Sequence, residues 1–311
     1  MSLKLAIYRQ WRKLRHIEYW LVAQFTFLIL RILGLLPPRA AINFMDRAAR
    51  RIGPLTGRHR VAMSNLKLAF PEKSDAELQS IALGMRGNMA RLLAEYVFLE
   101  KIFDYDPHAA EPGLIEVEGS EIFEKLVEEK KPRILFTAHA GNFELLPICA
   151  ATFGLEVTAL FRAPNNPYIA KKVLEARRTT MGGLIPSKAG AVWSLAAVLE
   201  ERGNVGMLVD QFFQNGADVT FFGRSALTSP LLPRLARQYD ADIYPARCIR
   251  LPGGRYRLQL FEKVDLPRTA KGKVDINASC QLLNDIVEGW VREYPDQWMW
   301  FHKRWKREKN R

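Results

Sequence analysis

The chain has 311 residues, of which 48% are hydrophobic and 25% are charged, with 20 glycines, 17 prolines and 3 cysteines. This composition excludes a disordered chain, a low-complexity chain and a disulfide scaffold, and it indicates a globular protein with a large core. The formal net charge of +13 favours a polyanionic partner, which would be nucleic acid, an acidic membrane surface or a phosphorylated substrate.

The basic residues gather at the two ends of the chain. Residues 1–15 contain five Lys or Arg and no acidic residue, and residues 302–311 contain six Lys or Arg and one Glu. Of the total of +13, only +3 is left for residues 16–301. This distribution favours two basic end segments that bind an anionic surface. The part of the chain between them has a nearly ordinary charge.

An apolar stretch of 18 residues, YWLVAQFTFLILRILGLL at 19–36, follows the basic start. Spanning a bilayer takes about 20 mostly apolar residues, and positive charge on both sides of the stretch gives no orientation. No small-residue cleavage site for a signal peptide follows it. We expect residues 1–40 to form membrane-associating helices that lie in or dip into the cytoplasmic face of the membrane. A spanning helix, a signal peptide and a helix packed on the protein's own core are the alternatives.

The rest of the chain predicts a single domain at 41–311. Residues 41–110 show a helical pattern, including a segment that opens with Ser74, Asp75 and Glu77 as an N-terminal capping signature. Strands and helices alternate in a core at 111–295, and a basic aromatic tail follows at 296–311. The expected strands lie at 115–119, 133–138, 156–161, 205–210, 219–222, 242–250 and 256–264, and the expected helices at 120–130, after 142, and at 166–181, 190–202, 229–239 and 276–293. This alternation predicts an α/β fold with a mixed, partly parallel sheet flanked by helices.

The first strand end that could carry chemistry reads RILFTA-HAGNFE. His139 leaves the strand on a turn, and Glu144 follows in the first turn of a helix, where it could hydrogen-bond the far ring nitrogen. Such a bond fixes the tautomer and makes the near nitrogen a better base for a hydroxyl nucleophile. Gly141 permits close backbone approach, and the N–H groups that open the helix could stabilise an oxyanion. The alternative is a helix cap with a satisfied histidine.

The second strand end reads VGMLVD-QFFQNG and places Asp210 and Gln211 in a loop. Functional residues of open α/β sheets collect beyond the carboxyl ends of strands, so both side chains are candidate substrate contacts. A turn-capping role for Asp210 is the alternative.

Several segments together resemble the late acyltransferases of lipid A biosynthesis, the lauroyl and myristoyl transferase family. They are HAGNFE after an apolar strand, LFRAPNNP, RRTTMGG, LVDQFFQNG with VTFFGRSALTSP, and the chain end EYPDQWMWFHKRWK. The likeness covers most of the chain. A histidine and an acid separated by four residues occur in a wider group of glycerolipid acyltransferases, whereas the ending DQWMWFHKRWK beside the Asp-Gln loop is more selective. Pro230 departs from the small residue that the family has there, which leaves the start of the following helix open.

The resemblance implies a glycerolipid-acyltransferase-like fold and an enzyme at the cytoplasmic face of the cell inner membrane. Such an enzyme transfers a fatty acyl chain from acyl carrier protein to a hydroxyl of an acylated lipid A precursor. Carried over by position, His139 is the general base, Glu144 is the acid that orients it, and Asp210 is a second acid near the site. A thioester is already activated, so the enzyme need only deprotonate the acceptor, hold the reactants together and stabilise the oxyanion.

The same resemblance gives the residues that would bind the acceptor. Arg162, just past a predicted strand, matches the family's motif arginine, and its planar fork suits a sugar phosphate. We also expect Asn142, Gln211 and Arg178 to contact substrate. For Arg178 and its neighbour Arg177, a solvated helix face is the alternative.

The implied partners are acyl carrier protein as co-substrate, the lipid A precursor and anionic inner-membrane lipid. We expect no nucleic acid, no cofactor and a monomer. We also expect no metal, because none of the five histidines pairs with another at ligand spacing. The ending QWMWFHKRWK interleaves aromatic and basic residues, which suits a lipid headgroup interface, single-stranded nucleic acid or tryptophans packed on the core, and we expect a mixture of interface and core.

Two rival functions follow from the same residues. A phospholipid-type glycerol-phosphate acyltransferase would use the same histidine and acid on another acceptor. A non-catalytic membrane or nucleic-acid binder would work through the two basic ends alone. The sequence gives neither the acyl chain length nor the hydroxyl that is acylated.

Overall fold

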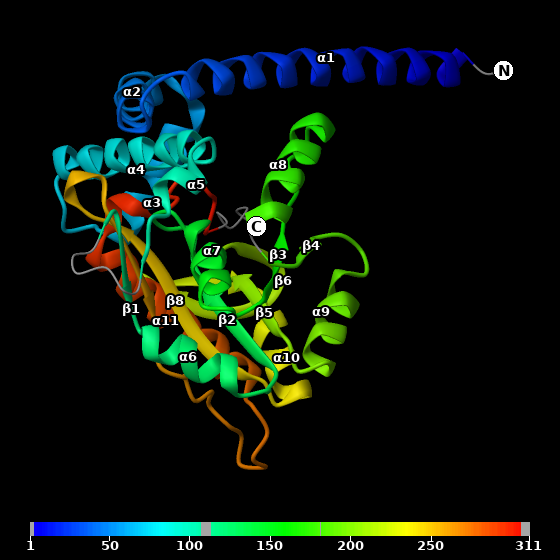
Figure 1. Cartoon of the computed structure of the whole chain (residues 1–311), viewed down its shortest axis with the longest axis vertical. Coiled ribbons are helices and arrows are strands. Elements are labelled where there is room, and N and C mark those ends of the chain that lie inside the picture. Colours follow the sequence, from blue (N-terminus) through cyan, green and yellow to red (C-terminus); the bar gives the residue numbers. More distant parts are fainter. Residues whose placement is uncertain (1–2, 107–112, 181, 306–311) are drawn as a thin grey trace, which may run out of the picture.

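The computed structural model describes residues 3–106, 113–180 and 182–305, and the side chains of residues 3–13 and 176–180 lie outside this description. A central sheet is covered by helices on both faces, and a long N-terminal helix lies along one end of the molecule (Figure 1). Before the sheet come α1 (Leu3–Gly34), α2 (Pro38–Ile52), a 3-10 turn (Gly53–Leu55), α3 (Gly57–Ala69), α4 (Asp75–Glu95) and α5 (Leu99–Ile102).

Seven strands form the central sheet, in the order β1-β9-β8-β2-β5-β3-β4. All neighbouring strands run parallel except β8 and β9, which are antiparallel. The strands are β1 (Ile115–Glu118), β2 (Arg133–Thr137), β3 (Val157–Phe161), β4 (Leu184–Pro186), β5 (Asn204–Leu208), β8 (Asp242–Arg250) and β9 (Tyr256–Leu260). The prediction of an α/β fold with a mixed, partly parallel sheet is confirmed.

Alternating side chains of the strands build two cores, one on each face of the sheet. On one face Ile134 and Phe136 pack with α9 (Ala191–Glu200), α10 (Leu231–Tyr239) and α11 (Ile276–Glu293). On the other face Leu135 packs with α6 (Ser120–Glu128) and α7 (Leu145–Thr152). Helix α8 (Pro167–Thr180) extends from the end of β3 toward α1 (Figure 1), and the Asn166 side chain donates to the Tyr19 carbonyl oxygen of α1.

From Leu14 onward, where its side chains are described, α1 is largely exposed. Its stretch Leu14–Gly34 is long and apolar enough to cross a membrane, and only 11% of the apolar window is buried in the molecule. A helix packed on its own core would bury much more of this surface, so among the alternatives for the N-terminal segment the core helix fits least.

Several local predictions are resolved by the structure. The capping signature at Ser74 is a full capping box with Glu77, which opens α4. This helix ends at Glu95, and the short α5 follows. Two strands had escaped the sequence pattern: β4, and β7 (Arg224–Thr228), which forms a separate hairpin with β6 (Phe212–Phe221). Helix α10 begins at Leu231, directly after Pro230.

The tryptophans of the C-terminal segment belong to the core. Trp298, Trp300 and Trp305 are buried, and so is Arg304, whose guanidinium hydrogen-bonds the Thr228 hydroxyl. Within residues 296–305, the exposed basic side chain is Lys303, while residues 306–311 lie outside the described part of the chain. The tryptophan rings therefore hold residues 298–305 against Phe221 and Phe222 at the β6–β7 hairpin.

Candidate functional site

The loop after β2 carries His139 and is held on both sides. Gly141 has φ +57°, and a Cβ there would lie 2.0 Å from the Cys248 carbonyl oxygen, so this position requires glycine. The Gly141 N–H donates to the Gln297 carbonyl oxygen at 3.0 Å, and the Met299 N–H donates to the His139 carbonyl oxygen at 3.1 Å. The C-terminal segment thus fixes the turn that presents the imidazole.

A buried carboxylate binds the far side of the imidazole. Asp210 follows β5, the strand next to β2, and its Oδ1 lies 2.8 Å from His139 Nδ1. Its Oδ2 accepts from the His139 backbone N–H at 2.9 Å and from the Trp298 indole N–H at 2.7 Å. Burial raises the pKa of Asp210, but the His139 charge and these hydrogen bonds outweigh it and lower the pKa to about 2. Asp210 is therefore an anion at neutral pH.

These contacts define how the imidazole is protonated. An ionised Asp210 can only accept, so in the neutral ring the proton sits on Nδ1 and the lone pair on Nε2. The Gln211 side-chain amide nitrogen lies 3.1 Å from Nε2, which suits an N–H pointing at that lone pair. The His139 side chain is 18% exposed and lines a cavity, so its basic nitrogen is placed where a substrate can reach it.

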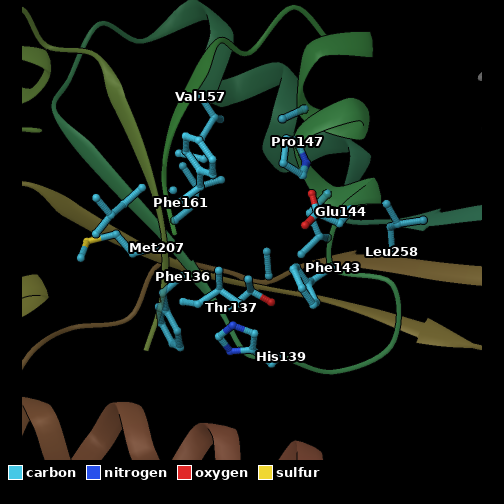
Figure 2. Close-up of a pocket in the computed structure, with 18 of the residues that line it drawn as sticks. Phe136, Thr137, His139, Phe143, Glu144, Pro147, Val157, Phe161, Met207 and Leu258 are labelled. Atoms are coloured by element: carbon cyan, nitrogen blue, oxygen red, sulfur yellow. The ribbon is translucent and has the colours of Figure 1, made fainter. Parts of the chain in front are cut away.

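The cavity occupies the α7 side of the sheet and measures about 250 Å³. Its walls are mostly apolar and come from several strands of the sheet and from α7; they include Phe136, Val157, Phe161, Met207, Leu258 and Pro147 (Figure 2). Ala159, Gly206 and Ala246 line it as well, and a Cβ at Gly206 would lie only 3.1 Å from Val157 Cγ1. Small residues on neighbouring strands thus leave a hollow that a hydrocarbon chain would fit.

Glu144 and Arg162 also line this cavity. Glu144 immediately precedes α7, is buried, and lies with Phe143 on the wall beside His139 (Figure 2). The partner of His139 Nδ1 is Asp210, so the orienting contact that the sequence predicted for Glu144 is made by the other acid, and the catalytic role of Glu144 stays a prediction. Arg162 is exposed at the end of β3, as expected for an arginine that meets a phosphate.

Asn142, another predicted site residue, is not part of the cavity lining. Asn142 is completely buried, and its side-chain amide donates to Glu95 Oε2 at 2.9 Å, so it supports the loop from behind. The side chain of Arg178 lies outside the described part of the structure.

Behind the loop lies a buried polar network that sequence reasoning missed. Glu95, on α4, accepts from the guanidinium of Arg250, from the Tyr256 hydroxyl at 2.6 Å and from Asn142. Both members of this ion pair are buried. These residues come from three distant segments, and no local pattern marks them.

His302 is a second histidine close to this centre. Its Nε2 accepts from the Phe212 backbone N–H at 3.2 Å, and burial lowers its pKa, which leaves the ring neutral at neutral pH. Trp298 and His302 both belong to the aromatic and basic ending QWMWFHKRWK, a pattern that fits a lipid interface as well as a site.

Known proteins of one family match this chain over nearly its whole length. The sequence profile of the family described as bacterial lipid A biosynthesis acyltransferase matches residues 8–307. A lipid A biosynthesis myristoyltransferase of Escherichia coli K12 is 25% identical over 307 residues, which cover 94% of this chain and 88% of the relative. A lipid A biosynthesis lauroyltransferase of the same strain is 25% identical over 300 residues, covering 92% and 88%. A lipid A biosynthesis acyltransferase 1 of Shigella flexneri is also 25% identical, over 94% of this chain and 88% of the relative.

Proposed function

Because the chain belongs to the bacterial lipid A biosynthesis acyltransferase family and is an acyltransferase, we propose that it moves a fatty acyl chain from acyl carrier protein to a hydroxyl of an acylated lipid A precursor. The observation that carries the proposal is the Asp210–His139 pair at the mouth of an apolar cavity. The pair supplies a base, and the cavity supplies a place for the acyl chain. The acceptor is assigned by analogy with the named relatives.

The proposed reaction begins when His139 Nε2 takes the proton of the acceptor hydroxyl. The oxygen attacks the thioester carbonyl, and the tetrahedral intermediate collapses with loss of the carrier's thiolate. The imidazolium then returns its proton to that thiolate, so the products are an ester and a free thiol. Asp210 holds the Nδ1–H tautomer and stabilises the imidazolium, and its pKa of about 2 means that it stays ionised throughout.

The position of Arg162 supports a phosphorylated acceptor. Arg162 is exposed at the rim, where its guanidinium could pair with a sugar phosphate while the hydroxyl lies at His139. The exposed apolar surface of Leu14–Gly34 supports action at a membrane surface. In the proposal this surface is the cytoplasmic face of the inner membrane, where donor and acceptor would meet.

The test is transfer of a labelled acyl chain from purified acyl carrier protein to a lipid A precursor. We expect His139→Ala to lose activity by at least about 100-fold, because general base catalysis contributes that much or more. The matched control is His16→Ala, at an exposed position on α1, which should transfer at the wild-type rate. Wild-type transfer by His139→Ala would refute the catalytic assignment. Glycerol phosphate in a parallel reaction tests the other acceptor class, and transfer to it alone would refute the proposed substrate.

A further inference from the structure

Two arginines share one aromatic ring on the surface beside α2. The guanidinium carbon of Arg58, in the first turn of α3, lies 5.4 Å from the centroid of the Phe301 ring, and that of Arg86, on α4, lies 5.8 Å from it. Within the described residues neither guanidinium pairs with a carboxylate. Partial burial and the neighbouring Arg58 charge lower the pKa of Arg86. Two like charges held together without an acid would be stabilised by an anion.

Arg86 is fixed in place rather than free to swing. Its aliphatic stem crosses Gly53, where a Cβ would lie 3.0 Å from Arg86 Cγ. One terminal nitrogen donates to the Thr56 hydroxyl at 2.7 Å, and that hydroxyl donates to the Gly53 carbonyl oxygen at 2.8 Å. The buried Nε of Arg86 has no hydrogen-bond partner. A pre-positioned guanidinium loses less side-chain entropy when it binds a ligand than a mobile one does.

Exposed apolar side chains flank the arginine pair. Leu55 is 85% exposed and directly precedes Thr56, which binds Arg86. Ile52 is 60% exposed and directly precedes Gly53, against which the Arg86 stem packs. Phe44, on α2, is 61% exposed. Helix α2 lies beside α1, whose apolar surface is also exposed (Figure 1). Large apolar side chains next to arginines are typical of a surface that inserts below the phosphates of a bilayer.

We propose that Arg58 and Arg86 form a binding site for the phosphate of an anionic phospholipid. Leu55 and Ile52 enter the acyl region while the two guanidinium groups hold the phosphate above it. The planar fork of arginine suits the phosphate oxygens. Cation–π contacts with the Phe301 ring hold both guanidinium groups close to each other. The apolar flank favours a bilayer lipid over the soluble part of a substrate. The site is separate from acyl transfer and stands without it.

The test measures partition of the purified full-length protein onto phosphatidylcholine vesicles with and without phosphatidylglycerol. The double variant Arg58→Gln/Arg86→Gln should bind the anionic vesicles more weakly, by about fivefold for each arginine removed. Binding to phosphatidylcholine alone should change little, because we expect it to depend on insertion of the apolar surface of α1. Thermal unfolding of each variant shows whether the fold is kept, and Arg58→Gln alone, at an exposed side chain, provides a second readout.

Two controls separate a phosphate site from diffuse positive charge. Arg58→Lys/Arg86→Lys keeps the charge but loses the fork, so the proposal expects it to bind nearly as weakly as the glutamine variant. Arg237→Gln, exposed on α10 at the opposite end of the molecule from α1 (Figure 1), should bind like the wild type. Wild-type binding by the lysine variant, or an equal loss in Arg237→Gln, would overturn the site. So would normal vesicle binding together with a raised KM for a phosphorylated acceptor, because the phosphate would then belong to the substrate.

Discussion

Three donors surround the carboxylate of Asp210: the His139 ring, the His139 backbone and the Trp298 indole. In Asp210→Asn the charge is lost and an amide N–H faces one of these donors. We expect kcat to fall by about 10³ to 10⁴-fold with little change in KM, because the imidazole loses the tautomer and the support that its protonated form needs. Steady-state acyl transfer measures both constants. Glu144→Gln is the comparison, and a larger kcat loss there than in Asp210→Asn would make Glu144 the orienting acid.

Asp210→Asn should also change how the free energy of unfolding depends on pH in the acid range. The pKa of Asp210 is about 2 in the folded protein, below the ordinary value of 3.8. Its stabilisation is therefore present above about pH 4 and is lost as the pH falls toward 2. We expect Asp210→Asn to lower the free energy of unfolding by about 2 kcal/mol at neutral pH and to flatten its decline across that window. Denaturant unfolding at several pH values measures this, and parallel curves for both proteins would contradict it.

At the residue scale the sequence located the reactive groups but not their pairing. His139 and Asp210 each leave the carboxyl end of an apolar strand, and both were predicted as site residues on that ground. Their contact depends on β2 and β5 being neighbours, although they lie about seventy positions apart in the chain. A local partner, Glu144, was the natural choice when only spacing was known.

At the scale of elements, the turn between β2 and α7 shows why the site tolerates little change. Gly141→Ala would combine a positive φ with a Cβ placed 2.0 Å from the Cys248 carbonyl oxygen. We expect it to lower the free energy of unfolding by more than about 3 kcal/mol and to lower kcat by about 100-fold, because the loop and His139 must move. Gly254→Ala is the matched control, since Gly254 has φ +80° but open space around it. It should cost about 1 kcal/mol and leave kcat unchanged. Equal stability losses would show that φ strain alone decides.

Elements with a clear sequence periodicity or a capping motif were predicted, and elements without one were missed. The long helices, the buried strands and the capping box at Ser74 were predicted because periodicity and caps are local properties. The short β4 and the hairpin strand β7 were missed, since three to five partly exposed residues carry little pattern. The buried pair of Glu95 and Arg250 could not be predicted either, because only the tertiary fold brings the end of α4 to the end of β8.

At the scale of the whole molecule, composition predicted the environment of the N-terminal segment better than that of the C-terminal segment. At the N-terminus the apolar helix is exposed and fits a membrane surface. At the C-terminus the interleaved aromatic and basic residues suited either a headgroup interface or a core, and the tryptophans are buried. Composition cannot separate these cases, because the burial of an aromatic side chain depends on what the rest of the chain packs against it.

Substitutions at two neighbouring basic residues, Arg304 and Lys303, test whether this part of the C-terminal segment serves the core or a lipid surface. Arg304 is fully buried, and its guanidinium hydrogen-bonds the Leu227 carbonyl oxygen at 3.0 Å and Asn284 Oδ1 at 2.7 Å, whereas Lys303 is exposed. Burial lowers the pKa of Arg304 to about 10, so the group remains charged at neutral pH. Arg304→Met leaves buried oxygens without donors and should lower the free energy of unfolding by about 2–4 kcal/mol, with little change in vesicle binding. Lys303→Met should leave stability within about 0.5 kcal/mol of wild type. An Arg304→Met protein of normal stability that no longer bound anionic vesicles would mean that this arginine serves the lipid surface and not the core.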